Sequence, residues 1–171
     1  VPPMTAQLID GKAVAADVLQ RVATAVHARR TAQRAPCLVT VLVGEDPASQ
    51  VYVRNKRMAC EKVGITSLPL HFASTLTQAA LLAEIDRLNS DDSVDGILVQ
   101  MPLPPQIDPN AVIERIHPAK DVDGFHPYNI GRLACRVPTL RPCTPYGVIE
   151  LLKSVGEPFK HRTTTAVRCL K

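Results

Sequence analysis

Two short apolar runs constrain the fold of this chain more than any other feature of its sequence. Residues 37–44 and 95–102 are rich in Val, Leu and Ile, and each is too short to be a complete buried helix. A run that is apolar without alternation is typical of a strand covered on both faces, as in a parallel sheet. We therefore predict a central sheet built around these two strands.

Segments with helical periodicity flank the two strands. Residues 11–31 carry valines at steps of four behind Asp10, a candidate N-cap, and residues 77–89 carry Leu and Ile at steps of three and four. Weaker patterns predict a strand over residues 67–72 and a short helix over residues 110–116. Strands that alternate with helices predict an α/β fold, a three-layer βαβ-type parallel sheet flanked by helices.

The last predicted element is a helix that follows residues 142–145. Thr144 is the expected N-cap and Pro145 the expected first helical residue, because a hydroxyl suits the cap and proline suits the first turn. The apolar residues expected on its buried side are Val148, Leu151, Leu152 and Val155.

A helix is also expected between the first two strands, and it carries the most suggestive pair of side chains. Tyr52 and Lys56 are four residues apart and share one helix face. A phenol beside an amine is a plausible proton-transfer pair, because burial of a lysine disfavours its charged form. The alternative is an amphipathic surface helix with a solvated lysine, ending near Gly64. Its predicted apolar side consists of Val51, Met58, Ala59 and Val63.

The predicted topology brings a third side chain towards this pair. In parallel α/β sheets, ligands bind beyond the carboxyl ends of the strands. Residues 44–50 and 100–105 follow the two apolar strands. We therefore expect Gln100 to lie near Tyr52 and Lys56.

The net charge of +4 does not predict a nucleic-acid surface. Residues 1–150 hold 15 basic and 15 acidic residues, so the excess charge lies in the last 21 residues, and aromatic residues make up only 4% of the chain. No apolar run approaches the roughly 18 residues of a membrane span, and no signal peptide is apparent. Five cysteines without a Cys-x-x-Cys pair favour a reducing, cytoplasmic setting. We predict no nucleic-acid partner and no membrane partner.

Neither a metal nor a nucleotide site is expected from the motifs. Asp121 and Asp123 form an Asp-x-Asp pair, but no further carboxylate or histidine stands at ligand spacing, so a turn with one functional carboxylate is the preferred interpretation and no metal is predicted. All eight glycines are isolated, so a glycine-rich phosphate loop is missing from the sequence. This disfavours a short-chain dehydrogenase, which also uses Tyr-x-x-x-Lys.

Four motifs together resemble one family. Tyr52-Val-Arg-Asn-Lys56, Asp95-Gly-Ile-Leu-Val-Gln100-Met-Pro-Leu-Pro104, Lys120-Asp-Val-Asp-Gly124 and Pro142-Cys-Thr-Pro145 are similar, in order and spacing, to the signatures of bifunctional methylenetetrahydrofolate dehydrogenase/cyclohydrolase. The resemblance covers roughly residues 7–160. It implies oxidation of methylenetetrahydrofolate with NADP, hydrolysis of the methenyl product to 10-formyltetrahydrofolate, a role in purine biosynthesis, and a homodimer.

The resemblance also implies roles for individual residues. Lys56 would be the acid–base and electrostatic residue at the one-carbon bridge, and Gln100 would hydrogen-bond Lys56 and tune its protonation. Asp123 would bind the pterin ring, because a carboxylate matches its donor edge. Tyr52 would stack on the folate or hydrogen-bond to it. Two further residues would line the tetrahydrofolate pocket, namely Ser49 and Pro102.

The resemblance ends near residue 160. We expect a tetrahydrofolate-binding catalytic domain over residues 1–155 and a basic tail over residues 156–171, where the family continues into an NADP-binding Rossmann domain. A natural truncation, a frameshifted reading and one strand of a lost domain are all compatible with this tail. We expect no NADP binding by this chain alone, whereas cyclohydrolase chemistry is still compatible with it. The alternative is a non-catalytic folate-binding fragment or a truncated product without activity.

Overall fold

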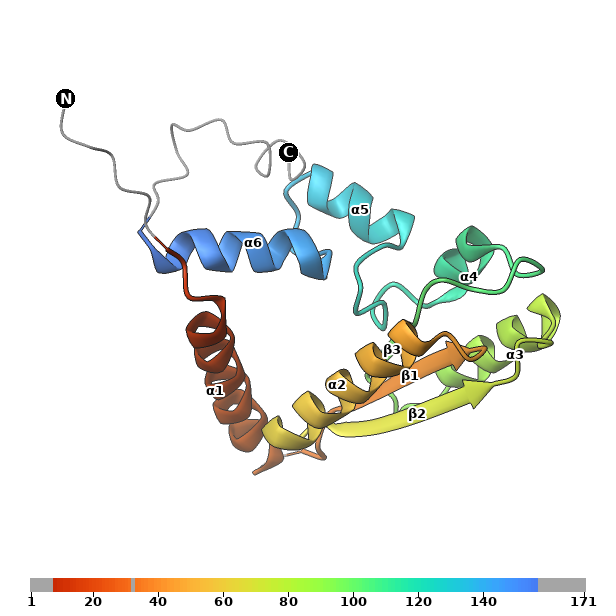
Figure 1. Cartoon of the computed structure of the whole chain (residues 1–171), viewed down its shortest axis with the longest axis horizontal. Helices are drawn as coiled ribbons and strands as arrows, with labels where there is room; N and C mark the ends of the chain where they lie inside the picture. The colour runs from red at the N-terminus through yellow and green to blue at the C-terminus, as the bar shows by residue number, and fades with distance from the viewer. Residues whose placement is uncertain (1–7, 32, 157–171) are drawn as a thin grey trace.

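The computed structural model describes residues 8–31 and 33–156 and is built on a three-stranded parallel sheet (Figure 1). Strand β1 (Cys37–Val43) lies between β2 (Thr66–Phe72) and β3 (Gly96–Val99) and pairs with both in parallel. This confirms the predicted α/β class and the two apolar strands, although β3 is shorter than the run that predicted it.

The outer strand β2 tolerates a proline because of its register. Thr66 N donates to Pro36 O at 2.8 Å, and Gly44 N donates to Phe72 O at 2.9 Å. In a parallel pair alternate residues bond to the same neighbour, so the even-numbered residues of β2 face β1. Pro69 therefore turns its backbone away from β1, where its missing N–H breaks no bond of the sheet.

Helices cover both faces of the sheet in three layers. Six helices are described: α1 (Gly11–Arg30), α2 (Pro47–Val63), α3 (Gln78–Asn89), α4 (Pro109–Arg115), α5 (Pro127–Ala134) and α6 (Cys143–Ser154). The main core lies between the sheet and the α3–α4 layer. Its buried members are Val39, Val41, Val43, Leu81, Ile85, Leu88, Val94, Ile97, Val99, Ile107, Val112 and Ile116. Helix α2 packs against the other face, while α1 contacts α2 and α6 (Figure 1).

Several helix ends follow local signals. Asp10 caps α1, as predicted, and Thr77 caps α3 by accepting a bond from Ala80 N. Helix α2 ends at Gly64, whose φ of +83° is the left-handed conformation that favours glycine at this position. None of the helices within residues 8–31 and 33–156 has the length and apolarity of a membrane span.

The predicted apolar side of α2 is wrong at two of its four positions. Val51 and Met58 are 57% and 52% exposed, whereas Ser49, Cys60 and Val63 are buried. At about 100° per residue, Val51 lies roughly 200° around the helix from Ser49, so the two cannot face the sheet together. The correct buried side includes a serine and a cysteine, which the apolar pattern overlooked.

The sequence prediction is also wrong at α6 and incomplete at α5. Helix α6 begins at Cys143 after Pro142, which provides no side-chain cap, so Thr144 is not the N-cap and Pro145 is not the first residue. Proline is tolerated there because N–H groups of the first turn lack intrahelical acceptors. None of the residues of α6 is buried.

Helix α5 was not predicted at all. Of the tail predicted over 156–171, all but Gly156 lies outside the described residues.

Candidate active site

The end of β1 sets the position of α2. Gly44 turns the chain with a φ of +90°, and Asp46 then caps α2 by accepting a hydrogen bond from Ser49 N at 2.8 Å. This bond lowers the pKa of the Asp46 carboxyl. The capped helix carries Tyr52 in its second turn and Lys56 in its third.

Lys56 and Gln100 meet, as predicted from the topology. Lys56 is half-buried, and its Nζ donates to Gln100 Oε1 at 3.1 Å. Gln100 follows β3 directly, and its backbone N donates to Val41 O at 2.8 Å. Its Nε2 donates to Met101 O at 2.8 Å, which leaves the amide oxygen directed at the lysine. The glutamine is thus oriented by the sheet and presents an acceptor to the amine.

Ser49 supports this arrangement rather than presenting a free hydroxyl. It is buried, and its Oγ donates to Met101 O at 3.4 Å, the same carbonyl that receives Gln100 Nε2. The next residue, Pro102, is exposed and follows a cis peptide bond. Both predicted pocket residues therefore lie beside Gln100.

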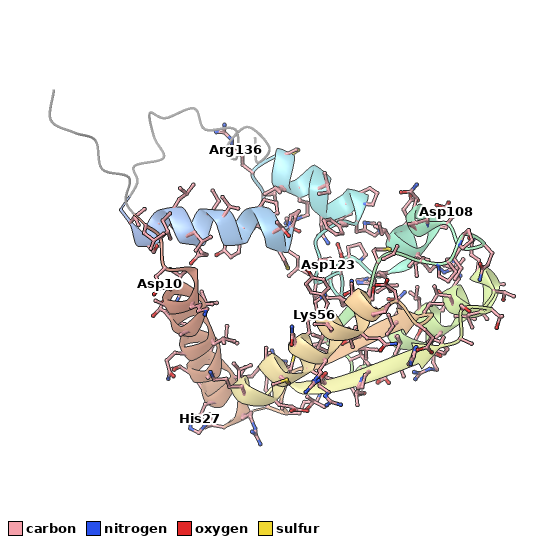
Figure 2. The ribbon with its side chains drawn as sticks, viewed as in Figure 1. Asp10, His27, Lys56, Asp108, Asp123 and Arg136 are labelled. Carbon is pink, nitrogen blue, oxygen red and sulfur yellow. The ribbon has the colours of Figure 1, made fainter. Side chains whose placement is uncertain are left out.

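Asp123 faces the same site from the other side. Figure 2 shows Asp123 and Lys56 close together, one from the segment before α5 and one from α2. Burial raises the pKa of the Asp123 carboxyl; the charge of Lys56 partly offsets this, and nearby Asp121 adds to it. The site therefore holds a half-buried carboxyl group within electrostatic range of an amine.

Tyr52 offers a ring rather than a buried hydroxyl. Its side chain is 60% exposed one helical turn before Lys56. An exposed aromatic face beside a half-buried amine can stack on a flat ligand. Four residues to which the resemblance gives roles, Tyr52, Lys56, Gln100 and Asp123, thus come to one site from α2, the end of β3 and the loop before α5.

Cys143 is a neighbour of the site that sequence reasoning assigned no role. Its Sγ donates to Val122 O at 3.4 Å. Partial burial of the sulfur and the charge of Asp123 raise the pKa of the thiol, against a smaller opposing effect of Lys56. Its only sequence signal was membership of the motif at residues 142–145.

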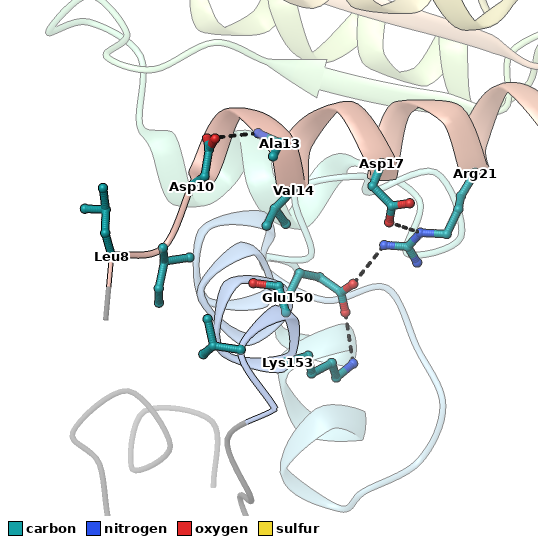
Figure 3. A pocket seen from close by; sticks show the side chains of 11 residues that line it. Leu8, Asp10, Ala13, Val14, Asp17, Arg21, Glu150 and Lys153 are labelled. Atoms are coloured by element: carbon teal, nitrogen blue, oxygen red, sulfur yellow. Dashed lines mark hydrogen bonds and ion pairs between the residues drawn. The ribbon is translucent and has the colours of Figure 1, made fainter. Parts of the chain in front are cut away.

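The cavity beside Asp123 is small, and a larger one lies elsewhere. A cavity of about 20 Å³ between β3 and α4 is lined by Asp121, Asp123 and Phe125, and holds about one water. A cavity of about 480 Å³ lies instead between α1 and α6 (Figure 3). There Arg21 bonds to Glu150 at 3.1 Å, so the polar groups satisfy one another, and no predicted site residue lines it. Neither of these two cavities is lined by Lys56 or Gln100.

The N-termini of three helices do not fit the pyrophosphate of a nucleotide. Such a group binds at a helix N-terminus, on free backbone N–H groups. In the described part of the chain the N-termini of α1, α2 and α4 are capped by carboxylates, namely Asp10, Asp46 and Asp108. A phosphate at any of these ends would meet a like charge. Within residues 8–31 and 33–156 there is also no cluster of three or more His, Cys, Asp or Glu side chains arranged to bind a metal.

Comparison with known proteins identifies the family. Residues 9–123 match the family model described as tetrahydrofolate dehydrogenase/cyclohydrolase, catalytic domain. The bifunctional enzyme FolD, a methylenetetrahydrofolate dehydrogenase/cyclohydrolase from Campylobacter jejuni, is similar at 46% identity and a TM-score of 0.86, over 88% of this chain and 54% of that one. A 5,10-methylenetetrahydrofolate dehydrogenase from Bombyx mori is 44% identical with a TM-score of 0.87, over 89% and 53% of the two chains.

A third solved structure adds a cofactor to the comparison. FolD from Trypanosoma brucei, complexed with NADP and an inhibitor, is 38% identical with a TM-score of 0.84, over 89% of this chain and 52% of that one. The present chain thus spans about half the length of these relatives. Since the family model matches most of the chain, this protein belongs to the tetrahydrofolate dehydrogenase/cyclohydrolase family.

Proposed function

We propose that this chain hydrolyses 5,10-methenyltetrahydrofolate to 10-formyltetrahydrofolate with its own residues. The observation that carries the proposal is the hydrogen bond of 3.1 Å between Lys56 Nζ and Gln100 Oε1, with the carboxyl group of Asp123 facing the same amine. Family membership supports a folate as the ligand.

Hydrolysis of the methenyl bridge requires a group that moves protons. Water adds its oxygen to the bridge carbon, the bond from that carbon to N5 breaks, and the new hydroxyl becomes the formyl carbonyl. Two protons leave the former water and one joins N5, so one proton is released. Lys56 would accept the first proton and return one to N5. Gln100 would hold the amine in one orientation by accepting one of its hydrogens.

The remaining residues would bind the substrate. The carboxylate of Asp123 would accept hydrogen bonds from the N–H groups of the pterin, which are charge-assisted and therefore strong. The exposed ring of Tyr52 would stack on the aromatic part of the folate. Ser49 and Pro102 would line the pocket beside Gln100.

We do not propose the dehydrogenase step for residues 8–31 and 33–156 alone. That step would need other residues to bind NADP. Oxidation of methylenetetrahydrofolate needs a hydride acceptor, and the carboxylate-capped helices of this chain do not fit its pyrophosphate. A calorimetric titration of the 171-residue chain with NADP should show no saturable binding. Saturable binding at micromolar concentration that resists added salt would contradict this.

Substitution Lys56→Met tests the hydrolytic role. Met has a similar length, so the fold should survive while the proton-transfer group is lost; general acid–base catalysis typically contributes about 10²–10⁴-fold to a rate. Hydrolysis would be followed by the loss of methenyl absorbance, and binding of 5-formyltetrahydrofolate by calorimetry.

The matched control is Lys62→Met, which removes an exposed lysine from the last turn of the same helix. It should hydrolyse at the parental rate. If folded Lys56→Met also kept the parental rate, Lys56 would have no part in the mechanism. A parent chain that binds 5-formyltetrahydrofolate but does not hydrolyse the methenyl form would instead favour a non-catalytic folate-binding fragment.

A further inference from the structure

Asp121 is a buried carboxylate that the proposed chemistry does not use. It is 3% exposed, and no lysine or arginine of the described residues forms a salt bridge with it. Its Oδ1 accepts from Gly124 N at 3.0 Å, and its Oδ2 accepts from His126 N and Asn129 Nδ2, both at 2.9 Å. A buried carboxylate is costly unless it is hydrogen-bonded, so these three donors account for its presence.

Two of those donors belong to the segment that carries Asp123. Gly124 N also bonds to Asp121 O at 3.3 Å, so the backbone and the side chain of Asp121 both close the turn 121–124. Asp123 is the third residue of this turn. The bond to His126 N then ties the start of α5 to the same carboxylate.

The turn is also held from outside. A Cβ at Gly124 would lie 2.6 Å from Arg141 C, so the turn packs directly on the chain that enters α6. Asn129 is 2% exposed; it donates to Asp121 and to Pro118 O, and its Oδ1 accepts from Thr139. Asp121 is therefore held by hydrogen bonds in a turn that packs against the entry to α6.

We propose that Asp121 is a positioning residue that holds Asp123 towards Lys56. This rests on the proposed function, because Asp123 is taken to bind the folate. In an Asp121→Asn variant one carboxylate oxygen becomes an N–H₂ group, which faces a donor instead of bonding to it. At least one of the three donors then loses its acceptor, and the turn that carries Asp123 shifts.

A double-mutant cycle tests whether Asp121 acts through Asp123. KM and kcat for methenyl hydrolysis, and the affinity for 5-formyltetrahydrofolate, would be measured for the parent, Asp121→Asn, Asp123→Ala and the double variant. Misplacement of a binding group by about 1 Å can cost on the order of a hundredfold. We expect Asp121→Asn to raise KM by about ten- to a hundredfold with a smaller effect on kcat, and to add almost nothing once Asp123 is alanine.

The neighbouring Lys120 provides the control. Its Nζ donates to Leu88 O, Asn89 O and Asp91 O at 2.8–2.9 Å, so it anchors the same segment to the end of α3 without bonding to the turn. Lys120→Met should lower stability while leaving KM within about twofold of the parent, because its three bonds go to carbonyls at the end of α3 and none goes to the turn 121–124.

The outcomes separate this inference from the proposed function. If Asp123→Ala changes neither KM nor affinity, the proposed folate site fails. If Asp123→Ala is damaging but Asp121→Asn raises KM by the same factor in both backgrounds, Asp121 has only a structural role and the inference is overturned. Should Asp121→Asn not fold, Asn129→Ala, which removes one of the three donors, replaces it in the cycle and is judged by the same criterion.

Discussion

Gly124→Ala is the substitution for which the structure makes the sharpest prediction. Gly124 has a φ of +67°, in the region that residues with a Cβ rarely adopt. Its Cβ would lie 2.6 Å from Arg141 C and 2.8 Å from Pro142 N. Both contacts are with backbone atoms, which cannot rotate away as a side chain does, so the chain entering α6 or the turn must move.

The magnitude follows from two costs. The left-handed conformation costs an alanine roughly 1–2 kcal/mol. Forcing an extra carbon into a packed site typically costs about 1–3 kcal/mol more. We therefore expect the free energy of unfolding to fall by about 2–5 kcal/mol, and folate affinity to fall with it, because the same turn carries Asp123, the residue proposed to bind the folate.

Urea unfolding followed by circular dichroism measures this change, and Gly147→Ala is its control. Gly147 lies within α6 and has no atom within 4 Å of an added Cβ, so alanine there should be neutral or stabilise by about 0.5–1 kcal/mol. A Gly124→Ala protein with the unfolding midpoint of the parent would refute the packing of this turn against Arg141 and Pro142.

Two further predictions concern pH. The pKa of Asp123 is raised, first by burial, so its folded pKa lies above the unfolded value of about 4, and stability falls as pH rises through the folded pKa. Asp123→Asn should therefore unfold at a higher temperature than the parent at pH 7 and lose this advantage below about pH 4; the same difference at both pH values would contradict the assignment. For Asp95, burial acts to raise the pKa, but hydrogen bonds from Arg34 and from Cys37 N outweigh it, so the net pKa is lowered. The stability from Asp95 is then present above about pH 4 and is lost as pH falls through the depressed folded pKa. Asp95→Asn should therefore lower the free energy of unfolding by about 1–2 kcal/mol at pH 7 and by progressively less in acid. Urea unfolding at a series of pH values measures this.

Local signals in the sequence predicted much of the fold. The strand Cys37–Val43 was predictable because burial on both faces makes its run apolar at every position except Thr40. Asp10 and Gly64 were predictable because capping depends on residues within one turn of the helix end. The proximity of Lys56 and Gln100 was predictable because a parallel sheet gathers the carboxyl ends of its strands at one edge.

The parts that could not be predicted depend on contacts between distant segments. The exposure of Val51 and Met58 is decided by which side of α2 meets the sheet, and their spacing fits either side. Helix α5 is only eight residues long, and its sequence has little beyond Pro127 to mark it.

The same division holds at the site. The sequence by itself determined the residue types, the strands, the caps and the motif that contains Asp123, because these depend on chemistry within a few residues. Only the tertiary structure decided that Asp121 is buried on three donors while Asp123, two residues on, faces Lys56. Two carboxylates so close in sequence look alike locally. They differ because the turn places one against the interior and the other against α2, and that placement is set by packing against α5 and the entry to α6.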